Sequence, residues 1–200
     1  MNDKTLVTFD NATYEVFKEE TVCGKHYYMA ERNLEDDTKE YVAGMIDKRF
    51  EAAGSLFLSA DVVSHDYCEI TDWFYGEIHE EIQQIKEKTK DLSKKVFTDK
   101  DCHSIYDYKS LAGQIVVMDA DIMYKEYRRS EYQLFVAKGG FGCNPHGSGN
   151  AIFAENLYTH EERRIEKYDI VGVIKSECLP EWAKKRYEEI QHQKNKGYER

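Results

Sequence analysis

The sequence lacks any apolar run long enough to cross a membrane. A spanning helix needs about 20 predominantly apolar residues, and no window of the 200-residue chain comes near that length. The opening residues, MNDKTLVTFDNATYEV, also lack the basic stretch followed by an apolar stretch that marks a secretion signal. We therefore expect a cytoplasmic protein that does not contact membranes.

Paired cysteine motifs are absent as well. The chain holds five widely spread cysteines with no CxxC pair: Cys23, Cys68, Cys102, Cys143 and Cys178. This pattern argues against a structural zinc site or a redox dithiol and favours reduced thiols. Cys143 and His146 have the spacing of two metal ligands, but a zinc site normally needs about four. We expect neither a metal nor another cofactor.

Positive charge is scarce in the first 80 residues. They contain 7 Lys and Arg against 18 Asp and Glu, a net charge of −11, whereas the rest of the chain contains 21 against 20. A segment this acidic does not bind a phosphate backbone, which needs clustered cations. Two interpretations stay open. The charge either keeps the protein in solution or directs it into a basic, nucleic-acid-binding groove of another protein.

Residues 1–97 are predicted to form an acidic region of mixed structure. Residues 5–29 predict three short strands, because Asp10-Asn11 and Gly24 mark turns between them. Residues 56–63 predict a short extended or connecting segment. Two helices are predicted from apolar residues at three- to four-residue spacing. The first covers residues 35–53, with Tyr41, Val42, Met45, Ile46 and Phe50, and the second runs from about Tyr67 to Lys90, with Ile70, Phe74, Ile78, Ile82 and Ile85.

Residues 98–200 are predicted to form a second, β-rich domain. Four apolar runs of strand length, rich in β-branched and aromatic residues, cover 114–123, 132–140, 150–157 and 168–174. Pro180 then precedes an amphipathic helix over residues 181–196. The fold class predicted is α+β: an N-terminal β-hairpin and helix part, followed by an antiparallel sheet with flanking helices.

A glycine-rich loop separates two of these runs. Five of the chain's twelve glycines lie in eleven residues: Gly139, Gly140, Gly142, Gly147 and Gly149. The spacing fails as a phosphate-binding loop, because the Lys and the Ser or Thr of that motif are missing. It fails as a dinucleotide motif because Pro145 replaces the third glycine. The loop is either a binding surface, formed by Gly139, Gly140, Phe141, Gly142 and Asn144, or a bend between paired strands.

His146 in this loop is a candidate general acid or base near neutral pH. Lys138 and Arg128 would neutralise phosphate charge, and Glu155 or Tyr132 would supply a second proton-transfer group. Such a set suits RNA cleavage without a metal. The alternative is an ordinary solvated loop histidine.

Two further polar groups each have two interpretations. Asp119 and Asp121 follow a strand and form either a divalent-metal pair or the polar end of that strand. His160, Arg163 and Arg164 alternate with glutamates, which favours a solvated turn over a nucleic-acid surface.

Residues 114–174 resemble a domain of proteins from conjugative elements and phages of Gram-positive bacteria. The matching pieces are Glu126-Tyr127-Arg128, Tyr132-Gln133-Leu134, Gly139 to Cys143 with Pro145 and Gly149, and Asp169 to Gly172. The resemblance implies an accessory protein of a mobile element, acting in the cytosol of a bacterial host. Small acidic proteins in that setting often disarm host defences, anti-CRISPR proteins among them.

The leading hypothesis is therefore an anti-defence protein that inhibits a CRISPR effector nuclease by protein contact. Its partner would be the effector or the effector's guide RNA complex. Asp36, Asp37 and Glu40 would face the basic guide or DNA channel, and Arg128 would add a binding contact. One alternative is a small metal-independent nuclease acting on RNA such as guide RNA. Another is a non-enzymatic accessory domain of conjugation machinery.

Overall fold

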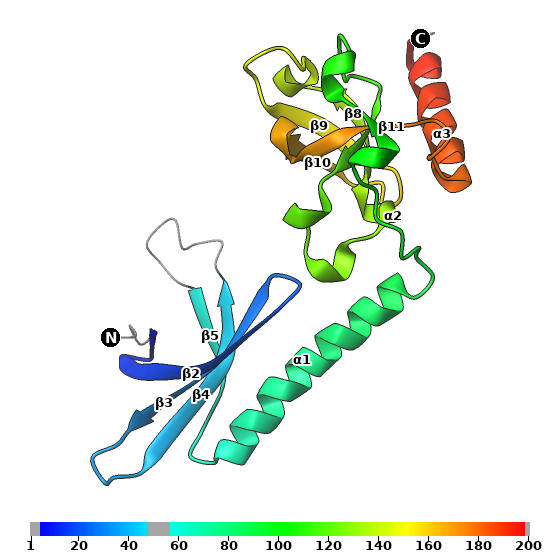
Figure 1. Ribbon diagram of the computed structural model, residues 1–200. Coiled ribbons are helices and arrows are strands. Elements are labelled where there is room, and N and C mark those ends of the chain that lie inside the picture. Colours follow the sequence, from blue (N-terminus) through cyan, green and yellow to red (C-terminus); the bar gives the residue numbers. More distant parts are fainter. Residues whose placement is uncertain (1–4, 48–56, 199–200) are drawn as a thin grey trace. The chain divides into compact units, whose positions relative to one another are not determined.

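The computed structural model describes residues 5–47 and 57–198, which divide into two compact units (Figure 1). Unit 1 comprises residues 1–90 and unit 2 residues 91–200. The sequence pattern places the boundary after residue 97 instead. The difference arises because Phe97 is buried in the core of unit 2, where its backbone N–H donates to the Gln133 side chain at 2.7 Å.

Unit 1 is a five-stranded antiparallel sheet followed by one long helix. The strands lie in the sheet in chain order: β1 (Leu6–Phe9), β2 (Ala12–Val22), β3 (Lys25–Asn33), β4 (Lys39–Asp47) and β5 (Phe57–Ser64). Helix α1 (Tyr67–Thr89) begins after Asp66, whose side chain accepts a hydrogen bond from the Cys68 N–H. This contact satisfies one of the N–H groups that a helix leaves unpaired at its start.

Each face of this sheet has its own apolar cluster. On one face Ile70 and Phe74 of α1 pack against Tyr27, Met29 and Ala43. The opposite face encloses a second cluster as β1 approaches β5: Val7, Tyr14, Tyr28, Ala30, Val42 and Ile46. Strands β4 and β5 approach closely at Gly44, where a Cβ would lie 1.7 Å from the Ser59 carbonyl oxygen.

The prediction of a helix over residues 35–53 is wrong in its described part, because Lys39–Asp47 form strand β4. Val42, Ala43 and Gly44 are buried in succession, since apolar side chains cover both faces of the strand. Continuous burial removes the two-residue alternation of a half-exposed strand, and a short apolar run of this kind also fits a helix. Phe50, the last residue of the expected stripe, lies outside the described residues. The three strands over residues 5–29 and the helix from Tyr67 are confirmed.

Unit 2 is built on a six-stranded antiparallel sheet with the order β10-β9-β8-β7-β11-β6. The strands are β6 (Cys102–His103), β7 (Ile115–Met118), β8 (Leu134–Gly139), β9 (Ala151–Asn156), β10 (Glu162–Glu166) and β11 (Ile170–Ile174). The α-helices are α2 (Ser130–Gln133) and α3 (Glu181–Tyr198). The short 3-10 turns are η2 (Asp99–Asp101), η3 (Ile105–Asp107), η4 (Ala120–Ile122), η5 (Lys125–Tyr127), η6 (Phe141–Cys143) and η7 (Lys167–Asp169).

Successive residues of the central strand β8 enter different cores. Leu134 packs with Ala183 and Ile190 of α3. Phe135 packs on the other face, with Ile105 of η3 and Cys143 of η6. The four strands and the C-terminal helix expected in this half are confirmed, as is the α+β class. Within the described ranges, no helix has both the length and the apolar character needed to cross a membrane.

Phe74 provides a direct test of the α1 packing, because its side chain is fully buried. We expect Phe74→Ala to lower the free energy of unfolding of unit 1 by about 3–5 kcal/mol, from lost burial plus the cavity left behind. The chain has two tryptophans, Trp73 in unit 1 and Trp182 in unit 2. Trp73 fluorescence during urea unfolding, measured in a Trp182→Phe background, therefore reports on unit 1.

Tyr75→Ala is the matched control, because this neighbouring ring is 51% exposed. Its removal should change the same free energy by less than about 1 kcal/mol. Equal effects of the two substitutions would show that the buried face of α1 is wrongly assigned.

Candidate functional site

The net charge of the chain resides in unit 1. Residues 1–90 contain 10 Lys and Arg against 20 Asp and Glu, whereas residues 91–200 contain 18 of each. The described cations of strands β2 to β4 all pair with glutamates of the same unit: Lys18 with Glu20, Lys25 with Glu81, Arg32 with Glu40, and Lys39 with Glu31. Exposed carboxylates remain in excess around these pairs, including Asp10, Glu19, Glu35, Asp61 and Glu80. Unit 1 therefore presents a negative surface to any partner.

The turn between β3 and β4 is acidic and exposed. Asp36 Oδ1 accepts hydrogen bonds from the Thr38 hydroxyl at 2.5 Å and from the Thr38 N–H at 3.1 Å, and these two bonds lower the pKa of the Asp36 carboxyl. Asp37 is exposed and has a positive φ of 62°. Asp36 also lines an open surface depression, together with Leu34, Thr38, Lys39, Tyr41 and His65. Asp36 and Asp37 thus face solvent, as the binding hypothesis requires.

Glu40, the third expected binding carboxylate, is already engaged inside the fold. Its Oε2 atom accepts hydrogen bonds from the Tyr14 hydroxyl at 2.6 Å and from Arg32 Nε at 2.7 Å. The Tyr14 hydrogen bond is the main reason that the pKa of Glu40 is lowered, while burial and the same bond raise the pKa of Tyr14 to about 12. Glu40 therefore stabilises unit 1 and is not available to a partner.

The glycine-rich loop folds back against the start of β9, the strand that follows it. An added Cβ would lie 2.4 Å from the Ala151 carbonyl oxygen at Gly140, 2.3 Å from the Asn150 carbonyl oxygen at Gly142, and 2.4 Å from Phe141 Cβ at Gly149. Gly140 also has a φ of +114°, which side chains rarely adopt. The space beside each of these glycines is thus filled by neighbouring residues of the same loop and strand. This favours the interpretation of the loop as a bend over that of a binding surface.

A lysine from outside the loop helps to hold it. Lys167 Nζ donates to the Gly147 carbonyl at 2.7 Å and to the Pro145 carbonyl at 3.3 Å. Within the loop, the His146 N–H donates to Asn144 Oδ1 at 3.1 Å. The exposed feature of the loop is Phe141, whose side chain is 85% accessible to solvent.

Within the described part of the chain, the ring of His146 contacts none of the other residues of the predicted catalytic set. The imidazole lies 5.9 Å from the ring of Tyr106 and is exposed. Cys143 points into the core, where burial raises the pKa of its thiol. In residues 5–47 and 57–198, no group of three or more His, Cys, Asp and Glu could hold a metal ion.

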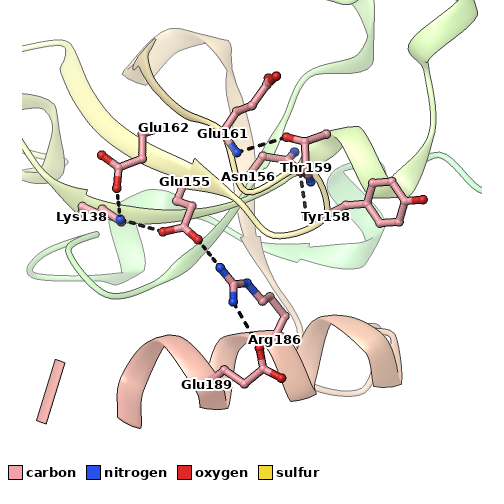
Figure 2. Close-up of polar contacts among 9 residues, drawn as sticks. All are labelled: Lys138, Glu155, Asn156, Tyr158, Thr159, Glu161, Glu162, Arg186 and Glu189. Atoms are coloured by element: carbon pink, nitrogen blue, oxygen red, sulfur yellow. Dashed lines mark hydrogen bonds and ion pairs between the residues drawn. The ribbon is translucent and has the colours of Figure 1, made fainter. Parts of the chain in front are cut away.

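Glu155 lies between two cations on the face of the sheet that α3 covers. Figure 2 shows Lys138 of β8 and Arg186 of α3 reaching it from opposite sides, with distances of 2.6 Å to Lys138 Nζ and 2.7 Å to Arg186. Lys138 also pairs with Glu162, and Arg186 with Glu189 at 3.1 Å. Burial by itself would raise the pKa of Glu155, but the hydrogen bonds from the two cations outweigh it and lower the pKa. Glu155 is therefore an ionised carboxylate that fastens α3 to the sheet.

The structure brings only two of the four members of the predicted catalytic set into described contact. Cys143 anchors the loop of His146 on the face opposite α3, whereas Glu155 and Lys138 lie on the α3 face. Tyr132 belongs to a row of edge-on rings, 5.0 Å from the ring of Tyr127 and 6.3 Å from that of Tyr158. Glu155 and Lys138 are thus the only two of the four for which the described contacts show a direct interaction.

Arg128 and the two aspartates organise the segment between β7 and α2. Arg128 pairs with Asp121 at 3.2 Å and donates to the carbonyls of Asp121 and Met123. Asp119 accepts a hydrogen bond from the Asp121 N–H at 2.9 Å. These contacts match the interpretation of the aspartates as a polar strand end.

The basic residues expected in a solvated turn belong partly to a strand. Arg163 and Arg164 lie on β10, and His160 occupies the preceding turn with a φ of +64°. Arg163 stacks over the ring of Phe135 at 4.6 Å, and Arg164 pairs with Glu166 at 2.6 Å. The strand escaped sequence analysis because Ile165 is its only buried residue.

Two buried amides were also missed by sequence analysis. Gln133 is fully buried, and its side chain donates to the carbonyls of Phe97 and Met118, both at 3.0 Å. Asn156 accepts hydrogen bonds from the N–H groups of Tyr158 and Thr159 (Figure 2). Nothing in the local residue pattern distinguishes these amides from exposed ones.

Comparison of the chain with protein-family models, curated proteins and solved structures finds no match.

The loop geometry predicts that alanine at two glycines of the loop will change the free energy of unfolding by different amounts. Gly142→Ala should lower the free energy of unfolding of unit 2 by about 1–3 kcal/mol, because its Cβ would overlap the Asn150 carbonyl. Gly139→Ala is the control, since no atom lies within 4 Å of a Cβ at that position. It should change the free energy by less than about 1 kcal/mol. Trp182 fluorescence in a Trp73→Phe background measures both, and equal destabilisation would contradict the described loop.

The Glu155 network predicts a pH-dependent stability. A lowered pKa in the folded state means that the ionised carboxylate stabilises unit 2 above the unfolded pKa of about 4.3, and that this contribution disappears as pH falls through the folded pKa. We expect Glu155→Gln to cost about 1.5–3 kcal/mol at pH 7. The difference from the unsubstituted protein should shrink below about pH 4. Urea unfolding at several pH values tests this, and a constant difference would refute it.

Proposed function

We propose that this protein inhibits a CRISPR effector nuclease by protein contact, with unit 1 occupying a basic channel that otherwise binds guide RNA or DNA. The observation that carries the proposal is the concentration of the whole net charge of −10 in unit 1, whose described sheet cations are each paired with glutamate. The resemblance of residues 114–174 to a mobile-element domain supplies the setting. In this proposal the protein is encoded by a mobile element and acts in the cytosol of a bacterial host.

Electrostatics gives the proposal its physical form. Complementary charge raises association rates from about 10⁵–10⁶ to as much as about 10⁸–10⁹ M⁻¹s⁻¹ at low salt. The Debye length falls to about 8 Å at physiological ionic strength, so steering of this kind weakens as salt is added. A negatively charged domain competes with a nucleic acid for the same cations. It therefore inhibits without needing any chemistry of its own.

The geometry favours binding over RNA cleavage. A nuclease of the kind considered needs an acid, a base and a cation around one phosphate. Glu155 and Lys138 neutralise each other, and the loop of His146 packs on the opposite face of the sheet. No contact in the described chain favours cleavage as a second candidate.

The proposal is tested by two incubations with purified CRISPR effectors from Gram-positive bacteria. Guide RNA incubated with the protein alone should stay full-length on a denaturing gel. Effector loaded with guide RNA should lose cleavage of its target DNA when the protein is added. If the guide RNA is shortened instead, the protein is an enzyme that cleaves RNA and the proposed inhibition by contact is refuted. Undiminished DNA cleavage by every effector in the panel would refute the proposal and favour an accessory domain.

Charge reversal tests whether unit 1 makes the contact. Glu19 and Glu35 are exposed, and their side chains make no hydrogen bond or ion pair with residues 5–47 and 57–198. We expect Glu19→Lys with Glu35→Lys to slow association with the inhibited effector by about tenfold at 50 mM salt and less at 300 mM salt, because screening removes the attraction. Surface plasmon resonance measures the rate constants.

The control carries the same change of charge on unit 2, in Glu177→Lys with Glu188→Lys, which are also exposed. The control should associate at close to the original rate. If both pairs slow association equally, the net charge of the whole chain matters and unit 1 has no special role.

A further inference from the structure

Unit 1 carries an exposed aromatic cluster beside the start of α1. Phe17 of β2, Tyr41 of β4 and Tyr67 of α1 form it, with ring centroids 5.6–6.4 Å apart. Two of the three pairs have the edge-on geometry that aromatic rings prefer. Phe17 is 40% exposed and Tyr67 49% exposed, so the rings are held by one another while much of their surface faces water.

The sheet is only partly covered here, because the helix has just begun. Tyr67 is the first residue of α1, and the buried contacts of the helix with the sheet begin at Ile70. The strand positions beside Tyr67 therefore meet the helix only at its exposed first residue. They include the row in which Glu31 of β3 is paired in register with Tyr41.

Carboxylates flank the aromatic cluster. Glu15 is paired in register with Glu31, and Glu31 with Tyr41, so the three side chains project from the same face of the sheet. Glu31 binds Lys39 at 2.6 Å. Both carboxylates and the three rings belong to the unit that carries the net charge of −10.

We infer that the aromatic cluster is the contact point for an arginine side chain of a basic partner. The inference rests on the proposed function and names the chemistry of its interface. A guanidinium is flat, stacks on aromatic rings and donates paired hydrogen bonds to a carboxylate, whereas an ammonium has no flat face. Rings and carboxylates lie together on this surface, as arginine requires. Interfaces also concentrate their binding energy in aromatic and arginine residues.

Charge decides between a basic partner and a second copy of this chain. Two copies meeting through their aromatic clusters would bring together two units of net charge −10. Their repulsion disfavours such a dimer, whereas a cationic partner is attracted to the same surface.

The inference is tested with two fluorescein-labelled peptides of equal charge, nona-arginine and nona-lysine, titrated with the full chain at 50 mM salt. Fluorescence anisotropy should show tighter binding of the arginine peptide. Phe17→Ser and Tyr67→Ser should each weaken that peptide by roughly two- to fivefold, the range expected for one exposed ring under a cation. Binding of the lysine peptide should change by less than about twofold.

Tyr168→Ser is the matched control, because this ring is 73% exposed and lies in unit 2. It should leave both affinities unchanged. If Phe17→Ser lowers the melting temperature of unit 1, Phe17→Leu replaces it, since leucine keeps the apolar contacts and removes only the ring.

The outcomes separate the inference from the proposed function. Equal affinity for the two peptides, unaffected by the ring substitutions, overturns the arginine site and leaves the charge-driven inhibitor standing. Failure of both peptides to bind overturns the two together. Sedimentation that shows a dimer, lost in Tyr67→Ser, would assign the aromatic cluster to a second copy and overturn the arginine site.

Discussion

A buried polar group that lacks a partner costs free energy, and in unit 2 this cost decides where the flanking segments lie. Gln133 attaches the segment at Phe97 to the sheet by bonding both its N–H and its carbonyl group. Glu155 attaches α3 through Arg186. A hydrogen bond to a charged group contributes about 1.5–3 kcal/mol, so the loss of either partner is costly. A few polar side chains therefore position elements that apolar packing alone would allow to slide.

Unit 1 follows a different rule, because its ion pairs lie near the surface and its cores are apolar. Exposed ion pairs contribute about 0–1 kcal/mol each, and an excess of one charge opposes compact folding through repulsion. Two apolar clusters, one under α1 and one inside the curled sheet, stabilise this unit without help from the excess carboxylates. The acidity is thus separable from the fold, which is why charge reversal at exposed positions probes function and not folding.

Periodicity predicts those elements that have one buried face and one exposed face. Helix α1 is such an element, with Ile70 and Phe74 buried and polar residues such as Asp72 exposed. Strand β4 is not, because both of its faces are covered, and its sequence fits a helix equally well. Periodicity misses strand β10 for the opposite reason, since only Ile165 of that strand is buried. Charge and composition likewise locate the acidic unit, but the pairing that removes Glu40 from its surface depends on Tyr14 and Arg32, which are distant in sequence.

The most conspicuous sequence motif is not the proposed contact surface, again because contacts between residues distant in the sequence decide which side chains are exposed. The glycines of residues 139–149 stand out because they are adjacent, yet the space they leave is filled by the strand that follows them. Phe17, Tyr41 and Tyr67 are far apart in the chain and meet only through sheet register and the starting point of α1. A β-bulge adds to this, because the register shifts between Val16 and Lys18 and leaves Phe17 as the extra residue. Bulges redirect side chains, so the exposed position of Phe17 is a property of the folded sheet that no pattern of residues along the strand contains.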